Sequence, residues 1–327
     1  MIEAEKKSEI LDKQDLVENQ VDIVATEPVF VEKEQKPAAT FYPIDNPKDE
    51  YVEIYSGQAL TAEQLFRFSA KEDVNVTLIA GPYSSGKTTL IVMLYRLFLA
   101  GYNKKLQFAG SITIGGFENR SKDLLCKSGN AEPLVTRTSR MAEDRYLHLI
   151  IASEPRTVQN LFFADISGET FSDDRSMETI AECFEDTENV IVVVDGEKLC
   201  NNSEKQKTKY ATKMLLKRLL NKKILSKRTK LQIIFTKKDK IEQSEQKEQV
   251  IEMMKEMEQT FCTSLEAYVY SIKCLSISAL STAEEECEKL EIILQNCMEK
   301  TKKEDSIPLE MEQFKIKRNF DKFQMRG

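Results

Sequence analysis

The feature that most constrains the fold is a glycine-rich stretch at residues 81–88, which reads GPYSSGKT. It fits the pattern G-x-x-x-x-G-K-[ST]. Residues 74–80 before it are mostly apolar or β-branched and predict a buried strand, whereas apolar side chains recur at helical spacing over residues 90–98. The sequence therefore predicts a strand, a tight loop and a helix, in contrast to an isolated glycine-rich turn.

The chemistry of this loop suits phosphate groups. Gly81 and Gly86 permit backbone angles at which successive N–H groups point inward, and the start of the following helix favours an anion. Lys87, which we expect to face solvent before a ligand arrives, adds a positive charge for the β- and γ-phosphates, and the Thr88 hydroxyl is placed to bind Mg²⁺. The predicted nucleotide-binding residues of this loop are Gly81, Ser84, Ser85, Gly86, Lys87, Thr88 and Thr89.

Composition excludes some other functions. The 327 residues are 41% hydrophobic, enough for one large core or two small ones, and the net charge of −7 disfavours a general nucleic-acid-binding surface. His148 is the only histidine, which argues against histidine-based catalytic triads and zinc sites. It stands in an alternating run, so we expect it on the surface of a strand and not as a ligand.

Several features favour a cytoplasmic protein. The seven cysteines form no C-x-x-C pair, which favours reduced thiols. The N-terminal residues are acidic and lack the apolar region of a signal peptide. The longest apolar stretch, residues 90–99, is too short to span a bilayer, so no transmembrane segment is expected.

The chain divides by composition into three parts. Residues 1–49 are rich in charged residues and glutamine and predict a disordered acidic arm. A nucleotide-binding domain is expected over residues 50–303, with an insertion at about 103–144. Residues 304–327 combine phenylalanines with basic residues and form a C-terminal tail, either an amphipathic helix or a docking segment.

The order of the predicted elements indicates an α/β fold. Strands at residues 146–151 and 158–164, joined by a turn, have the spacing of an antiparallel pair. From residue 190 onward, strands and helices alternate, which predicts parallel strands with helices on both faces of the sheet. The expected fold is that of a P-loop NTPase, with a mostly parallel sheet and one antiparallel strand pair.

A second motif, D-x-x-G, follows the strand at residues 158–164. Asp165 is predicted to take part in Mg²⁺ binding, and Gly168 lets its backbone N–H approach the γ-phosphate. Asp195 also ends an apolar strand and is the alternative metal ligand. We rank it lower because it lacks the D-x-x-G glycine spacing.

A third motif suits a guanine base. Thr236-Lys237-Lys238-Asp239 resembles [NT]-K-x-D, and a carboxylate at Asp239 can accept both N–H groups of the guanine edge, where adenine presents an acceptor. The stem of Lys237 can lie along the base. One strand later, the pair Ser278-Ala279 corresponds to the loop in which a backbone N–H meets the base O6. The alternative is a solvated basic turn.

Together these motifs resemble those of the translation-factor-related (TRAFAC) class of P-loop GTPases over residues 72–300. The run G-P-x-x-S-G-K-T-T, the insertion and D-I-S-G-E followed by Phe171 are similar to double-GTPase-type proteins of bacterial conflict systems. The resemblance implies that Lys87 and Thr88 serve the phosphates and Mg²⁺, that Asp165 and Gly168 serve the metal and the γ-phosphate, and that Lys237, Asp239 and Ala279 serve the guanine.

The sequence departs from that pattern at Thr236, where asparagine is commoner, and at Glu169, where many small GTPases have glutamine. A carboxylate near the γ-phosphate is repelled, although a raised pKa would let it hold the attacking water. The switch threonine is Thr136 or Thr138, with Thr136 preferred. Arg137 or Arg140 is a candidate arginine finger, and a basic loop without this role is equally compatible.

The sequence therefore predicts a switch that binds GTP and GDP with Mg²⁺ and hydrolyses GTP slowly or with a partner. The predicted catalytic residues are Lys87, Glu169 and Arg137. A protein partner is expected, and an oligomer is compatible with the sequence. The alternatives are a P-loop ATPase and a nucleotide-binding scaffold that never hydrolyses its ligand.

Overall fold

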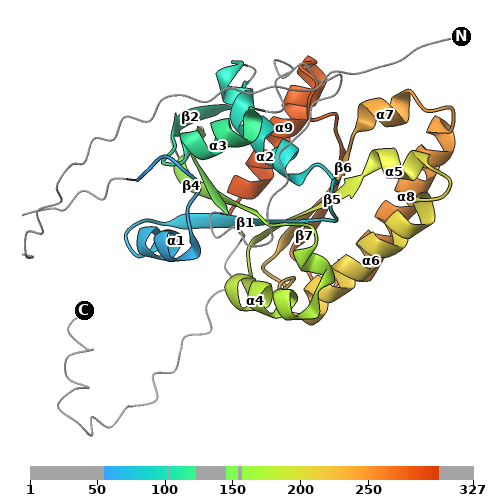
Figure 1. The fold of residues 1–327 in the computed structure, drawn as a ribbon, viewed down its shortest axis with the longest axis horizontal. Helices are drawn as coiled ribbons and strands as arrows, with labels where there is room; N and C mark the ends of the chain where they lie inside the picture. Colours follow the sequence, from blue (N-terminus) through green and yellow to red (C-terminus); the bar gives the residue numbers. More distant parts are fainter. Residues whose placement is uncertain (1–54, 102, 123–144, 154–156, 302–327) are drawn as a thin grey trace, which may run out of the picture. The chain divides into compact units, whose positions relative to one another are not determined.

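A mixed β-sheet runs through the part of the chain that the computed structural model describes, namely residues 55–101, 103–122, 145–153 and 157–301 (Figure 1). All of these residues belong to the unit Glu53–Gly327. The seven strands described have the spatial order β2-β3-β4-β1-β5-β6-β7. Their bounds are β1 Val74–Ala80, β2 Leu106–Gly110, β3 Tyr146–Ser153, β4 Thr157–Asp165, β5 Asn189–Asp195, β6 Lys230–Thr236 and β7 Ser271–Ser276.

Strand direction agrees with the predicted fold class. The strands from β4 to β7 in this order run parallel, and β3 runs antiparallel to its neighbours β2 and β4. The predicted antiparallel pair is confirmed, since β3 and β4 pair from Tyr146 opposite Ala164 to Ser153 opposite Thr157. The predicted turn between them, at residues 154–156, lies outside the described residues. Because β1 lies between β4 and β5, the loop after it starts near the middle of the sheet.

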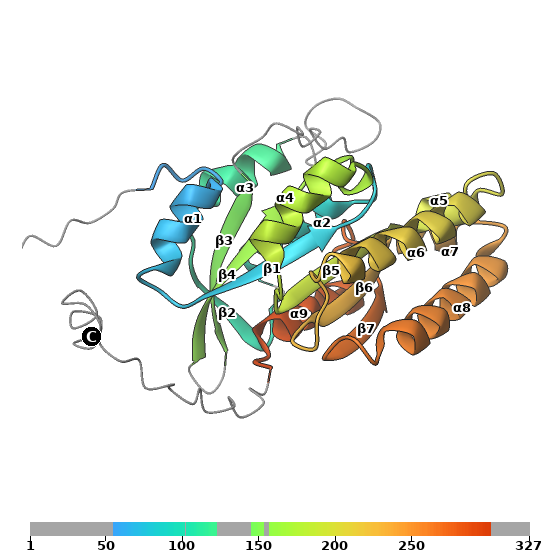
Figure 2. The same ribbon diagram turned by 90° about the horizontal axis from the view of Figure 1, so that it is seen from below.

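Helices cover both faces of this sheet, as predicted (Figures 1 and 2). Apolar side chains of α2, α3 and α9 pack on one face, and those of α1, α4, α6 and α8 pack on the other. The helix bounds are α1 Ala62–Ser69, α2 Lys87–Leu99, α3 Ile114–Ser121, α4 Asp174–Phe184, α5 Gly196–Cys200, α6 Lys205–Asn221, α7 Lys238–Glu242, α8 Lys247–Leu265 and α9 Glu284–Met298.

The strands obtain their stability from burial on both faces. Successive residues of β1 point to opposite cores, with Leu78 on one side and Ile79 on the other. Every residue of β5 and β6 is buried, as expected for parallel strands between two helical layers. Each fully buried large apolar side chain contributes about 1.5–3 kcal/mol, so the strands form a rigid base for the loops at their ends.

The structure adds several elements to the predicted pattern. The described part of the expected insertion at 103–144 contains β2, which extends the sheet, and α3. Helices α4 and α7 were not predicted, whereas α8 covers most of the helix that the alternating pattern predicts at about residues 243–261. The arm at 1–49 and the tail at 304–327 lie outside the described residues.

His148 corrects one prediction, because its side chain is fully buried and not on a strand surface. Its ring stacks on Phe162 with the centroids 4.4 Å apart, and Phe68 of α1 covers it at 5.3 Å. The ring Nδ1 accepts a hydrogen bond of 3.2 Å from the backbone N–H of Ile112, and Nε2 lies 3.2 Å from Asn160 Oδ1. Burial lowers the pKa of His148 to about 4, and the bond with Asn160 opposes this shift. The sequence pattern did not reveal that α1 covers this face.

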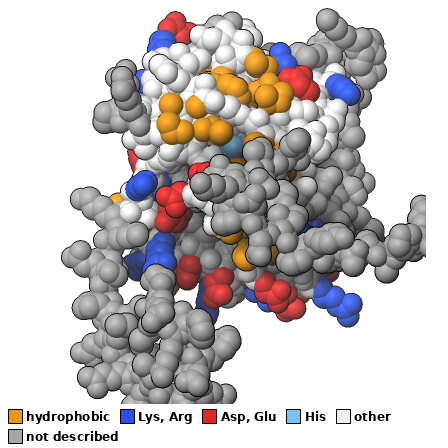
Figure 3. All heavy atoms as spheres, turned by 90° about the vertical axis from the view of Figure 1, so that its left-hand side faces the viewer, with side chains coloured by type: hydrophobic (Ala, Val, Ile, Leu, Met, Phe, Trp, Pro, Cys, Tyr) orange, Lys and Arg blue, Asp and Glu red, His pale blue; other side chains and the backbone are white. Residues whose placement is uncertain are grey.

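The side of the molecule that carries α1 and β2 shows apolar side chains on part of its surface (Figure 3). Exposed apolar residues of the elements on this side are Phe66, Phe108 and Ile114. Scattered apolar exposure of this kind is common in folded proteins and defines no site by itself. Among the described residues, no helix combines the length and the apolar character that crossing a membrane requires.

Candidate nucleotide-binding site

The predicted motifs gather at one edge of the sheet, at the carboxyl ends of the parallel strands. The glycine loop follows β1, Asp165 ends β4, Asp195 ends β5 and Thr236 ends β6. Ligands of open α/β sheets bind in the crevice at this edge, where the connections diverge to the two faces. The topology therefore brings together residues that are far apart in the sequence.

The glycine loop has the backbone shape that its sequence predicts. A Cβ atom at Gly81 would lie 2.7 Å from the Val193 carbonyl oxygen, so only glycine fits. Gly86 has φ +92° and Ser84 has φ +62°, and these left-handed residues turn the chain into α2 at Lys87. The Ser85 hydroxyl is buried and has no hydrogen-bond partner among the described residues, which leaves it available to a ligand.

Lys87 corrects another prediction, because its side chain is only 7% exposed and does not face solvent. Its Nζ donates hydrogen bonds of 3.1 Å to the Gly81 carbonyl and 3.0 Å to the Pro82 carbonyl. These carbonyls offer the ammonium group acceptors within the loop. Burial lowers the pKa of Lys87 to about 8, with Asp165 opposing the shift and Lys198 adding to it.

Thr88 and Asp165 form a pair of oxygen donors beside the loop. Thr88 Oγ1 lies 3.0 Å from Asp165 Oδ1 and 3.3 Å from Oδ2, and the Asp165 side chain is fully buried. The described residues contain no cluster of three or more histidine, cysteine or acidic residues that could hold a metal. A hydroxyl and one carboxylate nevertheless fit Mg²⁺, which takes few protein ligands and completes its shell with water and phosphate oxygens.

The D-x-x-G segment packs directly against the glycine loop. A Cβ atom at Gly168 would lie 2.3 Å from the Tyr83 backbone nitrogen, so this contact requires glycine. Glu169 follows in a turn and is partly exposed, and it precedes the short 3-10 helix Thr170–Ser172. Because the two segments are in close contact, a shift of one segment requires the other to shift as well.

The predicted base-recognition residues also lie together. The Ser278 hydroxyl donates a hydrogen bond of 2.8 Å to Asp239 Oδ1, and the backbone N–H of Ser278 donates one of 2.7 Å to Glu286 Oε2. Ala279 follows and is only 8% exposed. Glu286 of α9 thus holds the Ser278-Ala279 loop against Asp239, a role that the sequence did not reveal.

Thr236 connects the base motif to the glycine loop. Its hydroxyl lies 2.7 Å from the Ser85 carbonyl oxygen and 3.1 Å from the Val194 carbonyl oxygen. The nearest atom to a Cβ at Gly86 would be the Thr236 methyl group, at 3.5 Å. The residue that departs from the family pattern is therefore a bridge between the two halves of the site.

Lys237 and Asp195 form an ion pair next to this bridge. Lys237 has φ +56°, and its Nζ lies 2.9 Å from both Asp195 Oδ2 and Glu197 Oε2. Burial alone would lower the pKa of Lys237, but the hydrogen bonds to Glu197 and Asp195 outweigh it and raise the pKa. Asp195 also accepts hydrogen bonds from the first N–H groups of α5. It therefore caps a helix and holds Lys237, which favours Asp165 as the metal ligand.

The structure does not place every predicted site residue, and it adds one residue that the sequence did not indicate. The candidate switch and finger residues Thr136, Arg137, Thr138 and Arg140 fall outside the described residues. Arg120 of α3, which no motif indicated, reaches Asp165 with Nε 3.1 Å from Oδ2. Only the fold brings these two residues together.

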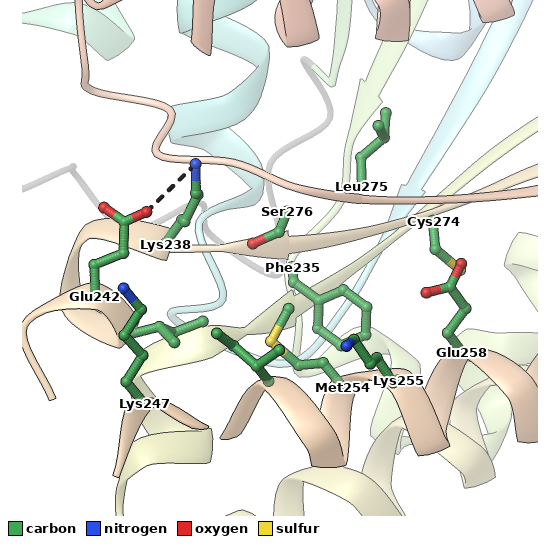
Figure 4. Close-up of a pocket in the computed structure, with 12 residues that line it drawn as sticks. Phe235, Lys238, Glu242, Lys247, Met254, Lys255, Glu258, Cys274, Leu275 and Ser276 are labelled. Carbon is green, nitrogen blue, oxygen red and sulfur yellow. Dashed lines mark ion pairs between the residues drawn. The ribbon is translucent and has the colours of Figure 1, made fainter. Parts of the chain in front are cut away.

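A separate cavity of about 290 Å³ lies between β6, β7 and the helices α7 and α8. Figure 4 shows Phe235 and Met254 in its wall and the ion pair of Lys238 with Glu242, which are 3.4 Å apart, at one side. None of its lining residues belongs to the glycine loop, and Asp165 and Asp239 do not line it. It is not the site assembled by the motifs.

Solved GTP-related proteins resemble the chain at low identity. They include the SRb-GTP/SRX complex of the signal recognition particle receptor from Chaetomium thermophilum, with 14% identity, TM-score 0.41 and coverage of 68% of this chain and 99% of that chain. The small GTPase Arl6 from Trypanosoma brucei has 12% identity, TM-score 0.40 and coverage of 69% and 99%. The elongation factor SelB from Methanococcus maripaludis has 14% identity and a TM-score of 0.35, and the match covers 70% of this chain and 35% of that chain. The chain therefore spans about a third of that protein.

No curated protein matches the chain in sequence. The model of one family, described as Double-GTPase 2, matches residues 76–291. This range contains the glycine loop, the D-x-x-G segment, the base motif and the Ser278-Ala279 loop. It confirms the resemblance to double-GTPase-type proteins, and the chain belongs to the Double-GTPase 2 family.

Proposed function

We propose that the protein is a GTP-binding switch that hydrolyses GTP slowly or with the help of a partner protein. The observation that carries this proposal is the bond between Thr236 and the Ser85 carbonyl, which joins a guanine-type motif to a phosphate-type loop. A site that reads a base and a phosphate chain together needs the two parts at a fixed separation. Membership of a GTPase family supports the same conclusion.

The phosphate half uses the loop backbone and Lys87. Inward N–H groups and the start of α2 bind the phosphate oxygens, and Lys87 exchanges its two carbonyl acceptors for them. Thr88 and Asp165 are the proposed Mg²⁺ ligands. The metal, when bound, would neutralise charge on the β- and γ-phosphates.

The base half uses Asp239. Its carboxylate accepts the two N–H groups of the guanine edge, and the Ser278 hydroxyl fixes its orientation. Lys237, held by Asp195 and Glu197, offers its stem to the base. Adenine presents an acceptor to Asp239 in place of a donor, so ATP is expected to bind much more weakly.

The proposal that hydrolysis is slow rests on the negative charge of Glu169. It stands beside the segment that contacts the glycine loop, and a carboxylate there is repelled by the γ-phosphate. Arg137 remains the proposed arginine finger, with a partner protein as the other source of such a group. Release of Gly168 and its neighbours after hydrolysis would be the signal that a partner reads.

The proposed compartment is the cytoplasm. The six cysteines among the described residues are free thiols, which agrees with a reducing environment. Fractionation of cells that express the tagged full-length chain tests this proposal. Recovery of the protein in the membrane fraction after a salt wash would contradict it.

The test of the proposed function is phosphate release by the purified full-length protein under single-turnover conditions, with Mg²⁺ and either GTP or ATP. We expect slow release from GTP and none from ATP at the same concentration. Faster release from ATP would identify an ATPase instead. Retained GTP without release, even with cell extract present, would identify a nucleotide-binding scaffold.

A further inference from the structure

Arg120 contacts the buried carboxylate that is the proposed magnesium ligand. Its Nε donates a hydrogen bond of 3.1 Å to Asp165 Oδ2, while the other carboxylate oxygen lies 3.0 Å from the Thr88 hydroxyl. Asp165 is fully buried, and the side chain of Arg120 is 20% exposed. The guanidinium group therefore lies beside the same pair of oxygen donors that suits Mg²⁺.

The helix that carries Arg120 is held firmly in the fold. The Thr113 hydroxyl, at the start of α3, accepts a hydrogen bond of 2.8 Å from the backbone N–H of His148. Phe117 stacks on Tyr95 of α2 with the ring centroids 4.7 Å apart. Arg120 also donates through Nη1 to the Gly116 carbonyl at 3.1 Å. The contact with Asp165 thus comes from a packed helix and not from a loose surface chain.

A buried carboxylate needs a positive partner, and a guanidinium or a metal ion meets this need. Two cations beside one carboxylate repel each other, so the metal and Arg120 oppose one another at Asp165. We propose that Arg120 is the internal counter-ion of Asp165 in the metal-free protein and competes with Mg²⁺ for it. This inference rests on the proposed nucleotide-binding function.

This competition couples the binding of Mg²⁺ to the position of the Arg120 side chain. When Mg²⁺ binds, the guanidinium leaves Asp165, and this displacement is transmitted to α3 through the side chain of Arg120. Because α3 packs against α2, which begins in the glycine loop, the metal state of the site affects helices on the same face of the sheet. Arg120 is thus a positioning residue that sets how much Mg²⁺ the site requires.

The test is the Mg²⁺ concentration that gives half-maximal binding of a fluorescent GDP analogue to the full-length protein. GDP is used because it lacks a γ-phosphate, which would offer the displaced Arg120 a second anionic partner. In Arg120→Gln this Mg²⁺ concentration should fall about tenfold. The metal then no longer has to break the charge-assisted hydrogen bond between Arg120 and Asp165, and the weakest bonds of this kind correspond to about a tenfold change in affinity. An unchanged or higher Mg²⁺ requirement overturns the proposal.

Two control variants separate charge from other effects. Arg120→Lys keeps a positive charge and should need more Mg²⁺ than Arg120→Gln does. Arg67→Gln removes an arginine from an exposed ion pair with Glu63 on α1 and should bind like the wild type. An equal fall in Arg67→Gln would show a general charge effect and overturn the proposal.

A second measurement uses only the wild-type protein, so its outcome does not depend on whether a variant folds. In the wild-type protein with GDP, the Arg120 Nε–H proton should be protected from solvent exchange without Mg²⁺ and lose protection when Mg²⁺ is added. Protection that persists overturns the proposal. Absence of GDP binding by the wild type at any Mg²⁺ concentration is a different result, because it removes the proposed function itself and the inference with it.

Discussion

The hydroxyl of Thr236 donates a hydrogen bond of 2.7 Å to the backbone carbonyl of Ser85, which ties the end of β6 to the glycine loop. Thr236 is only 2% exposed, so water cannot readily replace the hydroxyl if it is removed. Thr236, which stands where asparagine is commoner, therefore makes a direct contact with the glycine loop.

Thr236→Val should destabilise the protein by about 1–2 kcal/mol, because it removes a buried hydroxyl hydrogen bond that valine cannot replace. Binding of GTP and GDP should weaken by the same factor, since both share the loop. Urea unfolding and titration with fluorescent nucleotides measure the two effects. Thr212→Val is the matched control, since it removes a buried hydroxyl bonded to the Thr208 carbonyl in α6 and should leave binding unchanged.

Lys87→Ala should abolish measurable GTP binding, a loss of about 100-fold or more for a charged donor to phosphate. The free energy of unfolding should change by less than about 1 kcal/mol, because losing two carbonyl partners is offset by removing a desolvated charge. Titration and urea unfolding of one sample give both values. Lys209→Ala, which removes a partly exposed ion-pair partner of Glu256, is the control for charge. A folded variant that retains GTP affinity would contradict the assignment of the loop.

The affinity for GTP should decrease above pH 8. The free protein loses the Lys87 proton with a pKa of about 8, whereas bound phosphates favour the charged form. Binding above this pH therefore requires uptake of a proton, and the affinity should fall by up to about tenfold per pH unit. Below pH 8 the affinity should be constant with respect to this group.

Lys87→Arg is the control for this pH profile, because arginine stays charged and the base of GTP titrates equally in both proteins. The variant profile should be flatter than that of the wild type. Identical profiles would show that Lys87 does not lose its proton in this range.

The lowered pKa of His148 predicts that the protein loses stability in mild acid. The unfolded chain takes up a proton at the ordinary histidine pKa of 6.5, and the folded protein does so only near its lowered pKa of about 4. The free energy of unfolding should therefore fall as the pH decreases through this window, by up to about 3 kcal/mol. Urea unfolding between pH 7 and 4.5 measures the slope. His148→Gln should reduce it, and an equal slope in this variant would assign the effect to carboxylates.

The sequence predicted the parts of the fold that depend on local pattern. The strand over residues 74–80 has the predicted bounds. Thr61 and Gln64 form a capping box at the start of α1, which is also a local pattern. Helix α4 also carries a local signal, since Asp173 caps it and Met177 and Ile180 are buried at helical spacing.

Other features depend on contacts between distant parts of the chain. His148 is buried because α1 covers its strand, and the carbonyls of the glycine loop satisfy the buried ammonium group of Lys87. The contact of Arg120 with Asp165 joins residues 45 positions apart that share no motif. A single sequence names the motif residues of such a site but not the residues that hold them.

The central claim is that the site selects guanine through Asp239. Asp239→Asn removes one acceptor and introduces a donor, so the preference for GTP over ATP should decrease by at least about tenfold while the fold is kept. Asp174→Asn, an exposed carboxylate at the start of α4, is the matched control and should behave like the wild type. A variant with unchanged selectivity would remove Asp239 from base recognition.

The most direct measurement is competition between GTP and ATP for the wild-type full-length protein in the presence of Mg²⁺. A site built around Asp239 predicts that GTP displaces a bound fluorescent guanine nucleotide at a concentration at least about 100-fold lower than ATP does. Displacement by ATP at an equal or lower concentration would contradict the claim. The chain would then contain a phosphate-binding loop whose base preference is not set by the Thr236 to Asp239 motif.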